Sequence, residues 1–292
     1  MRAQVFKEEL QRYATLIEDF LNTLPWQKNV LAESMRYSLA GGGKRIRPVL
    51  ALAAAEMNGG DPKKVLPSAA ALELIHTYSL IHDDLPAMDD DDYRRGRLSN
   101  HKVFGEGTAI LAGDALLTYA FELLSLPADV APELQVRVLR EVAEAAGPRG
   151  MVYGQVLDLE GEGTSLSLAE IERIHRHKTG AMLMVSARLG GILAGSDELR
   201  LAALTEYAGA LGLAFQIKDD ILDVEGESEI LGKPVGSDQK RGKATYPSLL
   251  GLAGARAHLQ SQVDQAKASL RLFGQRGEFL RDLADFIAER RR

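Results

Sequence analysis

Residues 82–96 read HDDLPAMDDDDYRRG, which places six aspartates and two arginines within fifteen positions. Crowded carboxylates repel one another and oppose folding unless counter-ions, water or a bound ligand compensate for the repulsion. A metal site and a solvated acidic loop are both compatible with this stretch taken alone. The sequence on either side of it therefore has to decide between the two.

Helical geometry relates this stretch to the residues before it. Residues on a helix advance by about 100° each, so His76 and Asp83 return to nearly the same face two turns apart. Asp83 and Asp89 would point about 120° apart on a continuous helix. Pro86 lies between them and breaks the helix. The break would allow Asp83 and Asp89 to serve one metal cluster.

A second acidic group, FQIKDDILD, occupies residues 215–223. Asp219 and Asp223 are four residues apart and lie side by side on one helical face, with Gln216 one turn earlier. Gly209 and Gly212 on the same stretch would let a neighbouring helix or a substrate approach closely. Each acidic group alone could be a solvated face, but two such groups after apolar helices favour a shared metal site.

The residue types indicate which metal ion would bind and which kind of substrate it would contact. The chain has no cysteine and no clear set of several histidines, so oxygen ligands favour Mg²⁺ over zinc. Mg²⁺ usually bridges a few carboxylates to phosphate oxygens, which implies a phosphate-bearing substrate. Cations able to hold phosphate stand at Lys44, Arg45, Arg47, Arg94, Arg95, Lys178, Lys233 and Lys243.

Three rival motifs fail in detail. An EF-hand starting at Asp89 would need Gly and an acid where Arg94 and Asn100 stand. A His82-Asp83 pair of the HD phosphohydrolase type would leave the second acidic group without a role. The GGGK stretch at 41–44 lacks the GxxxxGK[ST] pattern of a P-loop and follows no strand.

Helical periodicity recurs through most of the chain, and β-branched alternation is almost absent. Pro132 and Gly147 bound a predicted helix over 132–146, and Ser167 with Glu170 forms a predicted capping box for a helix from about residue 168, with Leu166 and Ile171 as its hydrophobic staple. Further helices are predicted over 3–23, 28–40, 47–58, 63–84, 108–125, 198–224, 247–253, 256–272 and 277–290. We therefore predict one all-α domain over residues 1–292, a large bundle around a central active-site cavity. Residues 41–48 and 225–243 do not fit a helix, and the longer segment is predicted to close over the site.

Composition excludes several other classes of protein. The 292 residues include 35 basic and 41 acidic side chains, and a formal net charge of −6 argues against non-specific nucleic-acid binding. We expect no membrane span, because no stretch approaches about 18 apolar residues, and the N-terminus lacks a secretory pattern. The lack of cysteine is compatible with a reducing cytoplasm.

Six motifs together resemble the trans-isoprenyl diphosphate synthases, in particular the bacterial farnesyl diphosphate synthases (geranyltranstransferases). In chain order they are GGGKRIRP, DDLPAMD, RRG, HKTGAM, DDILD and GKATYP, and they extend from about residue 40 to 250. The resemblance implies an Mg²⁺-dependent prenyltransferase that is a cytoplasmic homodimer. Its implied substrates are isopentenyl diphosphate and dimethylallyl or geranyl diphosphate.

The resemblance also implies roles for individual residues. Asp83 and Asp89 would bind two Mg²⁺ ions and Asp219 a third, supported by Asp84, Asp220 and Asp223, with Mn²⁺ as an alternative ion. Residues implied at the allylic diphosphate are Arg94, Lys178 and Lys233, with Thr179, Gln216 and Lys243 nearby. Residues implied at a separate isopentenyl diphosphate site are Lys44, Arg47, His76 and Arg95. The position of His76 on the face of Asp83 agrees with this assignment.

Product length is implied by Tyr78 and Ser79, which in this family would form the floor of the hydrocarbon tunnel. Tyr78 with the insert LPAM resembles the C15-forming pattern, and packing between helices is the alternative role for this ring. Geranyl or geranylgeranyl diphosphate synthase, a terpene cyclase and a noncatalytic partner of a synthase stay open as alternatives. The C-terminal Arg290–Arg292 could cap the last helix, reach the active site or lie in solvent.

Overall fold

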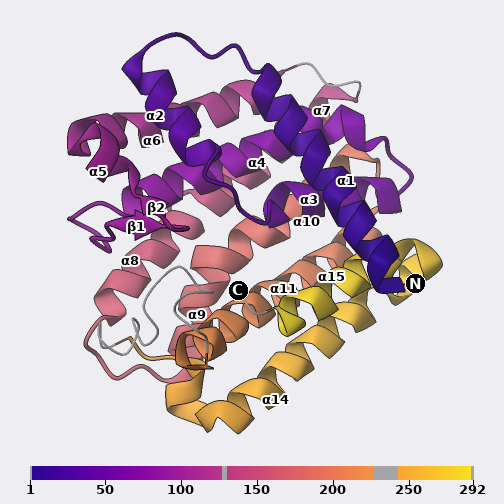
Figure 1. The fold of residues 1–292 in the computed structure, drawn as a ribbon. Helices are drawn as coiled ribbons and strands as arrows, with labels where there is room; N and C mark the ends of the chain where they lie inside the picture. Colours follow the sequence, from indigo (N-terminus) through magenta and orange to yellow (C-terminus); the bar gives the residue numbers. More distant parts are fainter. Residues whose placement is uncertain (1, 127–129, 226–242, 291–292) are drawn as a thin grey trace.

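The computed structural model describes residues 2–126, 130–225 and 243–290. Its helices are α1 (Arg2–Thr23), α2 (Val30–Leu39), α3 (Ile46–Met57), α4 (Pro62–Asp83), α5 (Asn100–Phe104), α6 (Glu106–Ser125), α7 (Pro132–Ala146), α8 (Met151–Gly161), α9 (Leu168–His175), α10 (Ala181–Leu193), α11 (Glu198–Glu225), α14 (Tyr246–Ser269) and α15 (Glu278–Glu289). A π-helical turn, η1 (Arg176–Gly180), joins α9 to α10, and a 3₁₀ segment, η2 (Arg271–Gly277), precedes α15. The prediction of an all-α fold is confirmed (Figure 1).

Helix α4 runs through the middle of the bundle and ends at the first acidic group. Asp61 caps it by accepting a 2.9 Å hydrogen bond from the backbone N of Lys63, and Pro62 occupies the first turn. All residues from Ala69 to Ile75 are buried, so this part of the helix has no solvent face. It packs against α1, α3, α6 and α10 (Figure 1).

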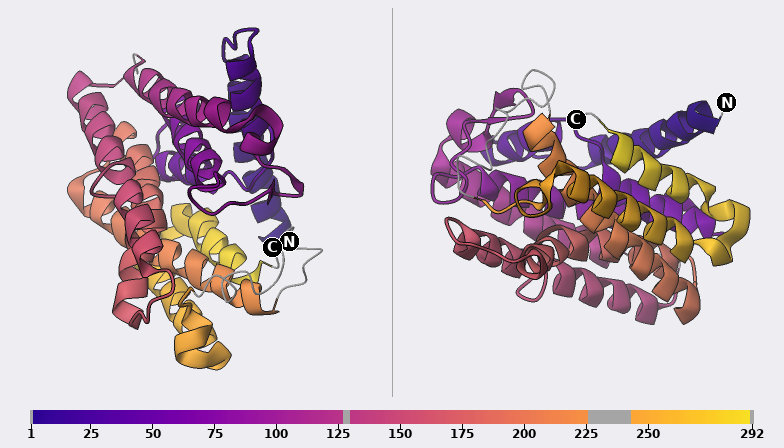
Figure 2. Two further views of the ribbon diagram at one scale, coloured as in Figure 1. Left: turned by 90° about the vertical axis from the view of Figure 1, so that its left-hand side faces the viewer. Right: turned by 90° about the horizontal axis from the view of Figure 1, so that it is seen from below.

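Helices α10 and α11 form the second half of the core, and α14 covers α11. Gly190 on α10 lies so close to the carbonyl of Ala51 on α3 that any Cβ would overlap it. Helix α1 crosses the molecule and packs against α15, where the rings of Phe6 and Phe279 lie 5.3 Å apart. The right-hand view of Figure 2 shows α1 (indigo) lying beside α15 (yellow).

Most predicted helix boundaries agree with the structure to within two residues. The capping box of Ser167 and Glu170 is confirmed, with the Ser167 backbone N donating to the Glu170 carboxylate at 2.8 Å. The predicted break between 253 and 256 lies instead at Gly251, whose φ of 68° interrupts α14. The reason is that a left-handed φ suits glycine and ends regular helix geometry there.

Three elements were not predicted: α5, α8 and a small antiparallel hairpin. The hairpin pairs β1 (Tyr93–Arg94) with β2 (Arg97–Leu98) through a two-residue turn. Both turn residues, Arg95 and Gly96, have positive φ (54° and 75°), as a type I′ turn requires. The strands are two residues long, too short for an alternating pattern to reveal them.

Helix α6 is long and apolar enough, by length and composition only, to cross a membrane, although acidic residues such as Asp114 interrupt its apolar run. In the structure 39% of its most apolar window is buried, and it packs against α4, α2 and α7. Core helices of soluble proteins pass the same test, so this one helix is weak evidence for a membrane.

Candidate active site

The first acidic group lies where α4 ends. The backbone N of Asp89 donates to the carbonyl of Asp83 at 2.8 Å, so the chain folds back over the helix end just after Pro86. Burial, with a smaller contribution from the negative charge of Asp89, raises the pKa of Asp83 to about 6 against the opposing positive charge of Lys178. Gln155 of α8 donates to the Asp83 carboxylate. The predicted break therefore brings Asp83 and Asp89 into one electrostatic environment.

Asp84 differs from Asp83 in its partner. The Arg94 guanidinium donates to both of its oxygens, with Nε at 2.7 and 3.0 Å and Nη2 at 2.6 Å. Such a bidentate pair fixes the orientation of the arginine as well as its charge. Asp84 thus holds Arg94 beside the acidic group.

Two lysines from distant segments meet at Asp158 on α8. Its carboxylate lies 2.7 Å from the Lys178 Nζ and 2.9 Å from the Lys243 Nζ. Burial by itself would raise the pKa of Asp158, but the two ammonium groups lower it to about 2. Lys243 also lies 3.9 Å from Asp89, so Asp158 ties both cations to the first acidic group.

Asp158 and Gln155 were not singled out from the sequence. The only available signal was their spacing of three residues, which places them on one face of α8. Because helix α8 itself was not predicted, the spacing of these two residues could not be interpreted as a shared helical face.

The second acidic group faces a different set of partners. Arg290 donates to Asp219 at 2.7 Å and to the Phe215 carbonyl at 2.9 Å, and its guanidinium stacks on the Phe215 ring at 4.0 Å. Three alternatives were considered for the C-terminal arginines: capping the last helix, reaching the site, or lying in solvent. Arg290 reaches the second acidic group. Asp220 is buried and accepts a 2.9 Å hydrogen bond from the backbone N of Tyr246, the first residue of α14, while Asp223 is buried nearby on α11.

The turn η1 connects the two acidic groups. Lys178 acts on Asp83, and the next residue, Thr179, donates to Gln216 at 2.9 Å, one helical turn before Asp219. Close approach depends on glycine: a Cβ on Gly154 of α8 would overlap the backbone of η1. A Cβ on Gly212 of α11 would lie 3.0 Å from the Cα of Gly180, which confirms the close approach expected at Gly212. At Gly209 the expectation of close approach was wrong, since a Cβ there would meet the Met184 sulfur at an ordinary contact distance of 3.6 Å.

A second group of cations lies beside α4. Burial lowers the pKa of Arg47 to about 10 and that of His76 well below its usual value, and the positive charges of Arg47 and Arg95 lower the pKa of His76 further. The Arg47 Nε and the His76 Nδ1 are buried and have no hydrogen-bond partner among the described residues. Arg95 donates to the Gly42 carbonyl, and Lys44 precedes α3. Buried polar atoms without partners beside several positive charges could accommodate an anion.

Arg45, by contrast, is engaged within the protein. Its guanidinium lies 2.7 Å from Glu18, 2.5 Å from Glu73 and 2.6 Å from the Leu39 carbonyl. Glu73, which sequence reasoning missed, also attracts Arg47 and Arg95 electrostatically. The ion pairs of Arg45 therefore anchor the glycine-rich turn to α4.

Tyr78 and Ser79 lie on α4 between these two polar regions. Tyr78 is buried with its ring edge-on to His82 at 5.6 Å, and burial together with Asp83 raises its pKa to about 12. The Ser79 hydroxyl donates to the His76 carbonyl at 2.9 Å. Lys233 and residues 226–242 of the predicted closing segment lie outside the described residues, as do Arg291 and Arg292.

Comparison with known proteins gives a consistent result. The profile of the polyprenyl synthetase family matches residues 28–275. A farnesyl diphosphate synthase of Geobacillus stearothermophilus is 50% identical over 289 residues, 98% of this chain and 97% of that protein. One from Escherichia coli strain K12 is 48% identical over 278 residues, 93% of each chain. The crystal structure of geranylgeranyl pyrophosphate synthetase from Pyrococcus horikoshii superimposes with a TM-score of 0.88 at 33% identity, over 99% of each chain. The chain described here belongs to the polyprenyl synthetase family.

Proposed function

We propose that this protein is a farnesyl diphosphate synthase, a prenyltransferase that joins isopentenyl diphosphate head-to-tail (1′-4) to dimethylallyl and then geranyl diphosphate. The observation that carries the proposal is the presence of two separate polar sites on one helix. The acidic site at Asp83 and the cationic site at His76 are two turns apart on α4. The proposal is supported further by relatives named farnesyl diphosphate synthase at about half identity over nearly the whole chain.

The acidic site suits divalent cations. Asp83 is a desolvated carboxylate whose charged form is disfavoured in the protein alone, and Asp89 adds like charge beside it. A hard cation with oxygen ligands would relieve both effects. We assign Asp83 and Asp89 to two Mg²⁺ ions and Asp219 to a third, with Mn²⁺ able to replace them. When bound, the ions neutralise the allylic diphosphate and make it a better leaving group.

The remaining side chains at this site bind and orient. The allylic diphosphate is held by Arg94, Lys178 and Lys243. The hydrogen bond between Thr179 and Gln216 fixes η1 against α11, between the two acidic groups. Asp84 positions Arg94, and Asp220 positions the start of α14. Asp223 supports α11 from within the core. Lys233 is assigned to the same diphosphate on the resemblance of its motif.

The cationic site receives the second substrate. Lys44, Arg47, His76 and Arg95 bind the diphosphate of isopentenyl diphosphate, whose double bond attacks the allylic carbocation. Exclusion of water protects that cation, and the segment 225–243 is proposed to close over the site. No side-chain acid–base pair is needed, because the released diphosphate accepts the proton lost after the new bond forms.

The C15 product follows from Tyr78. Its buried ring near Asp83 is proposed to form the floor of the hydrocarbon tunnel, with Ser79 beside it. Geranyl and geranylgeranyl diphosphate are the alternative products, and the relative from Pyrococcus horikoshii is named for the latter.

We also propose that residues 1–292 act as one domain and that the enzyme is a cytoplasmic homodimer. The buried apolar residues from Phe6 to Ile287 form one core cluster, which supports a single domain. Ile110 and Leu111 on α6 are 43% and 60% exposed, and a second copy of the chain would cover them. The Leu111→Glu variant should then elute as a monomer in size-exclusion chromatography with light scattering.

One assay tests the central proposal. Purified protein is incubated with isopentenyl diphosphate and either dimethylallyl or geranyl diphosphate, with Mg²⁺ or with EDTA, and the dephosphorylated product is identified. We expect farnesol from both allylic substrates with Mg²⁺ and no product with EDTA. An Asp219→Asn variant should lose activity, while Asp19→Asn, at an exposed position of α1, should retain it.

Each alternative gives a different result in the same assay. Geraniol or geranylgeraniol would change the product assignment within the family. A hydrocarbon formed without isopentenyl diphosphate would indicate a terpene cyclase. No product under any condition would indicate a noncatalytic partner and would contradict the proposal.

A further inference from the structure

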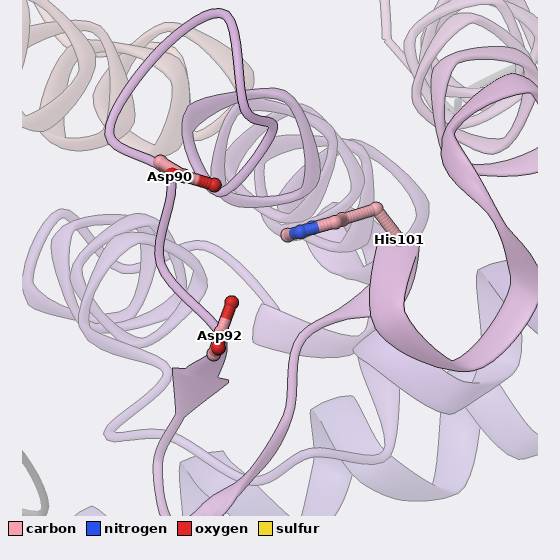
Figure 3. Close-up of side chains that lie close together, drawn as sticks. All are labelled: Asp90, Asp92 and His101. Atoms are coloured by element: carbon pink, nitrogen blue, oxygen red, sulfur yellow. The ribbon is translucent and has the colours of Figure 1, made fainter.

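Three side chains outside the assigned metal ligands converge beside the hairpin. Asp90, Asp92 and His101 each offer a ligand atom, and these atoms lie within 4.8 Å of one another. Figure 3 shows the two carboxylates and the imidazole pointing toward a common centre. Within the part of the chain that the structure describes, this is the one group of three or more acidic, histidine or cysteine ligands with that spacing.

The imidazole of His101 points to a ligand independently of the two acids. The side chain is only 6% exposed, and its Nε2 is buried with no hydrogen-bond partner among the described residues. Its Nδ1 contacts the Ser99 hydroxyl at 3.3 Å, so Nε2 is the ring nitrogen left for a ligand, and Figure 3 shows the ring turned toward the carboxylates. An unsatisfied buried nitrogen is unfavourable, and in the tautomer whose Nδ1–H donates to Ser99 the Nε2 lone pair also lies near negative charge. A cation at the common centre would satisfy both.

The charge and geometry of the cluster fit a divalent ion. Lys102 lies 2.7 Å from one oxygen of Asp92 and neutralises one of the two negative charges. Metal–ligand bonds of about 2.0 to 2.2 Å place neighbouring ligand atoms about 3.0 to 3.4 Å apart, closer than the observed limit. Asp90 and Asp92 are exposed and can rotate inward by this small distance, whereas the buried His101 is fixed.

The donor set selects the type of ion. Mg²⁺ and Ca²⁺ prefer all-oxygen ligands, whereas an imidazole with two carboxylates suits first-row transition ions and zinc. We infer that Asp90, Asp92 and His101 form a binding site for a transition-type divalent ion such as Zn²⁺, with water completing its coordination. The site is separate from the magnesium ligands proposed at Asp83, Asp89 and Asp219 and does not depend on the proposed prenyl transfer.

The ion would fix the position of the hairpin. The backbone N of Ser99 donates to the Asp92 carbonyl at 2.9 Å, so the cluster lies where the two hairpin ends meet. Arg94 extends from β1 to Asp84, so an ion that cross-links Asp90, Asp92 and His101 would restrain the strand that carries Arg94. The site is therefore a structural clamp beside the catalytic residues.

The test uses the full-length protein stripped with EDTA and then given excess Mg²⁺ to occupy oxygen-only sites. Co²⁺ is added as a spectroscopic probe and Zn²⁺ as the competing ion. We expect one Co²⁺ per chain, with a visible absorption band that Zn²⁺ abolishes. His101→Gln should weaken binding at least about tenfold and remove the band, and Asp90→Asn should weaken it too. The matched histidine control, His177→Gln, should leave binding unchanged.

One further variant and one further measurement keep the outcome decisive. Asp83→Asn should bind Co²⁺ like the wild type; loss of the band in this variant would place the ion at the catalytic acids and overturn the inference. An unchanged band in both His101→Gln and Asp90→Asn would overturn it as well. If His101→Gln fails to fold by circular dichroism, X-ray absorption of the Zn²⁺-loaded wild type decides: one imidazole ligand supports the site, and oxygen ligands alone refute it.

Discussion

Asp83 should reduce the stability of the metal-free protein, and Asp83→Asn should therefore stabilise it while abolishing activity. The pKa of Asp83 rises from 3.8 to about 6 because burial penalises its charged form. At about 1.36 kcal/mol per pKa unit, the ionised group costs about 3 kcal/mol at neutral pH. Partial exposure screens this cost, so we expect a gain of about 1 to 3 kcal/mol in the free energy of unfolding.

The contacts around Asp83 make the substitution a clean one. Lys178 keeps its 2.7 Å pair with Asp158, so removal of the Asp83 charge does not leave this lysine unpaired. The Gln155 amide that donates to Asp83 still finds an oxygen on the asparagine. The loss of charge is thus the main change.

The sign of the pH dependence follows from the raised pKa. Between pH 3.8 and about 6 the unfolded carboxyl has lost its proton while the folded one keeps it, so native stability falls as the pH rises. The advantage of the variant should be close to zero below pH 3.8, about half its full size near pH 5, and complete above about pH 6.

Urea unfolding in EDTA at pH 7.5 and pH 5, followed by circular dichroism, measures this difference. Asp19→Asn, at an exposed position, is the matched control and should change stability little at either pH. Mg²⁺ with diphosphate should stabilise the wild type more than the variant. A variant that is no more stable than the wild type at pH 7.5, or whose advantage does not shrink at pH 5, would refute the reasoning.

Three other substitutions test the remaining contacts. Gly154→Ala should destabilise the protein by about 1 to 3 kcal/mol and reduce kcat, since its Cβ would overlap the backbone of η1; Gly209→Ala, with room for a Cβ, should be neutral in the same thermal unfolding and steady-state assays. Asp158→Asn should lower the free energy of unfolding by about 2 kcal/mol at pH 7, because the pKa of this carboxyl is lowered from 3.8 to about 2 in the folded protein. The ionised carboxylate therefore stabilises the fold above pH 3.8, and this stabilisation is lost as the pH falls through about 2. Asp158→Asn should also raise KM for the allylic diphosphate, whereas Glu160→Gln should leave it unchanged. If the Asp158→Asn variant had the same KM as the wild type, the role given to the two lysines would be contradicted. Tyr78→Ala should lengthen the product seen by chromatography, and an unchanged C15 product would show that this ring is not the tunnel floor.

Local features of the site could be predicted from the sequence because they depend on neighbouring residues. Pro86 ends α4 and turns Asp89 back toward Asp83, as its ring and the residue spacing require. Ser167 and Glu170 start α9 through hydrogen bonds within one turn. The positions of both acidic groups on their helices are likewise set by a periodicity of a few residues.

Contacts between distant segments could not be predicted in this way. Asp158 holds lysines that are 20 and 85 residues away, and Arg290 reaches Asp219 over 71 residues. Neither helix periodicity nor residue type carries information about such separations. They depend on how α8 and α11 approach η1, which small glycines permit but do not by themselves dictate.

The sequence by itself determined the helical fold, the two acidic groups and the cations able to bind phosphate, because each of these features depends on residue type and on spacings of a few residues. Only the tertiary structure decided which cation pairs with which carboxylate. It also brought the buried His101 ring against Asp90 and Asp92. The physical reason is that charges and ligand atoms act over a few ångströms in space, and packing of the whole bundle sets those distances.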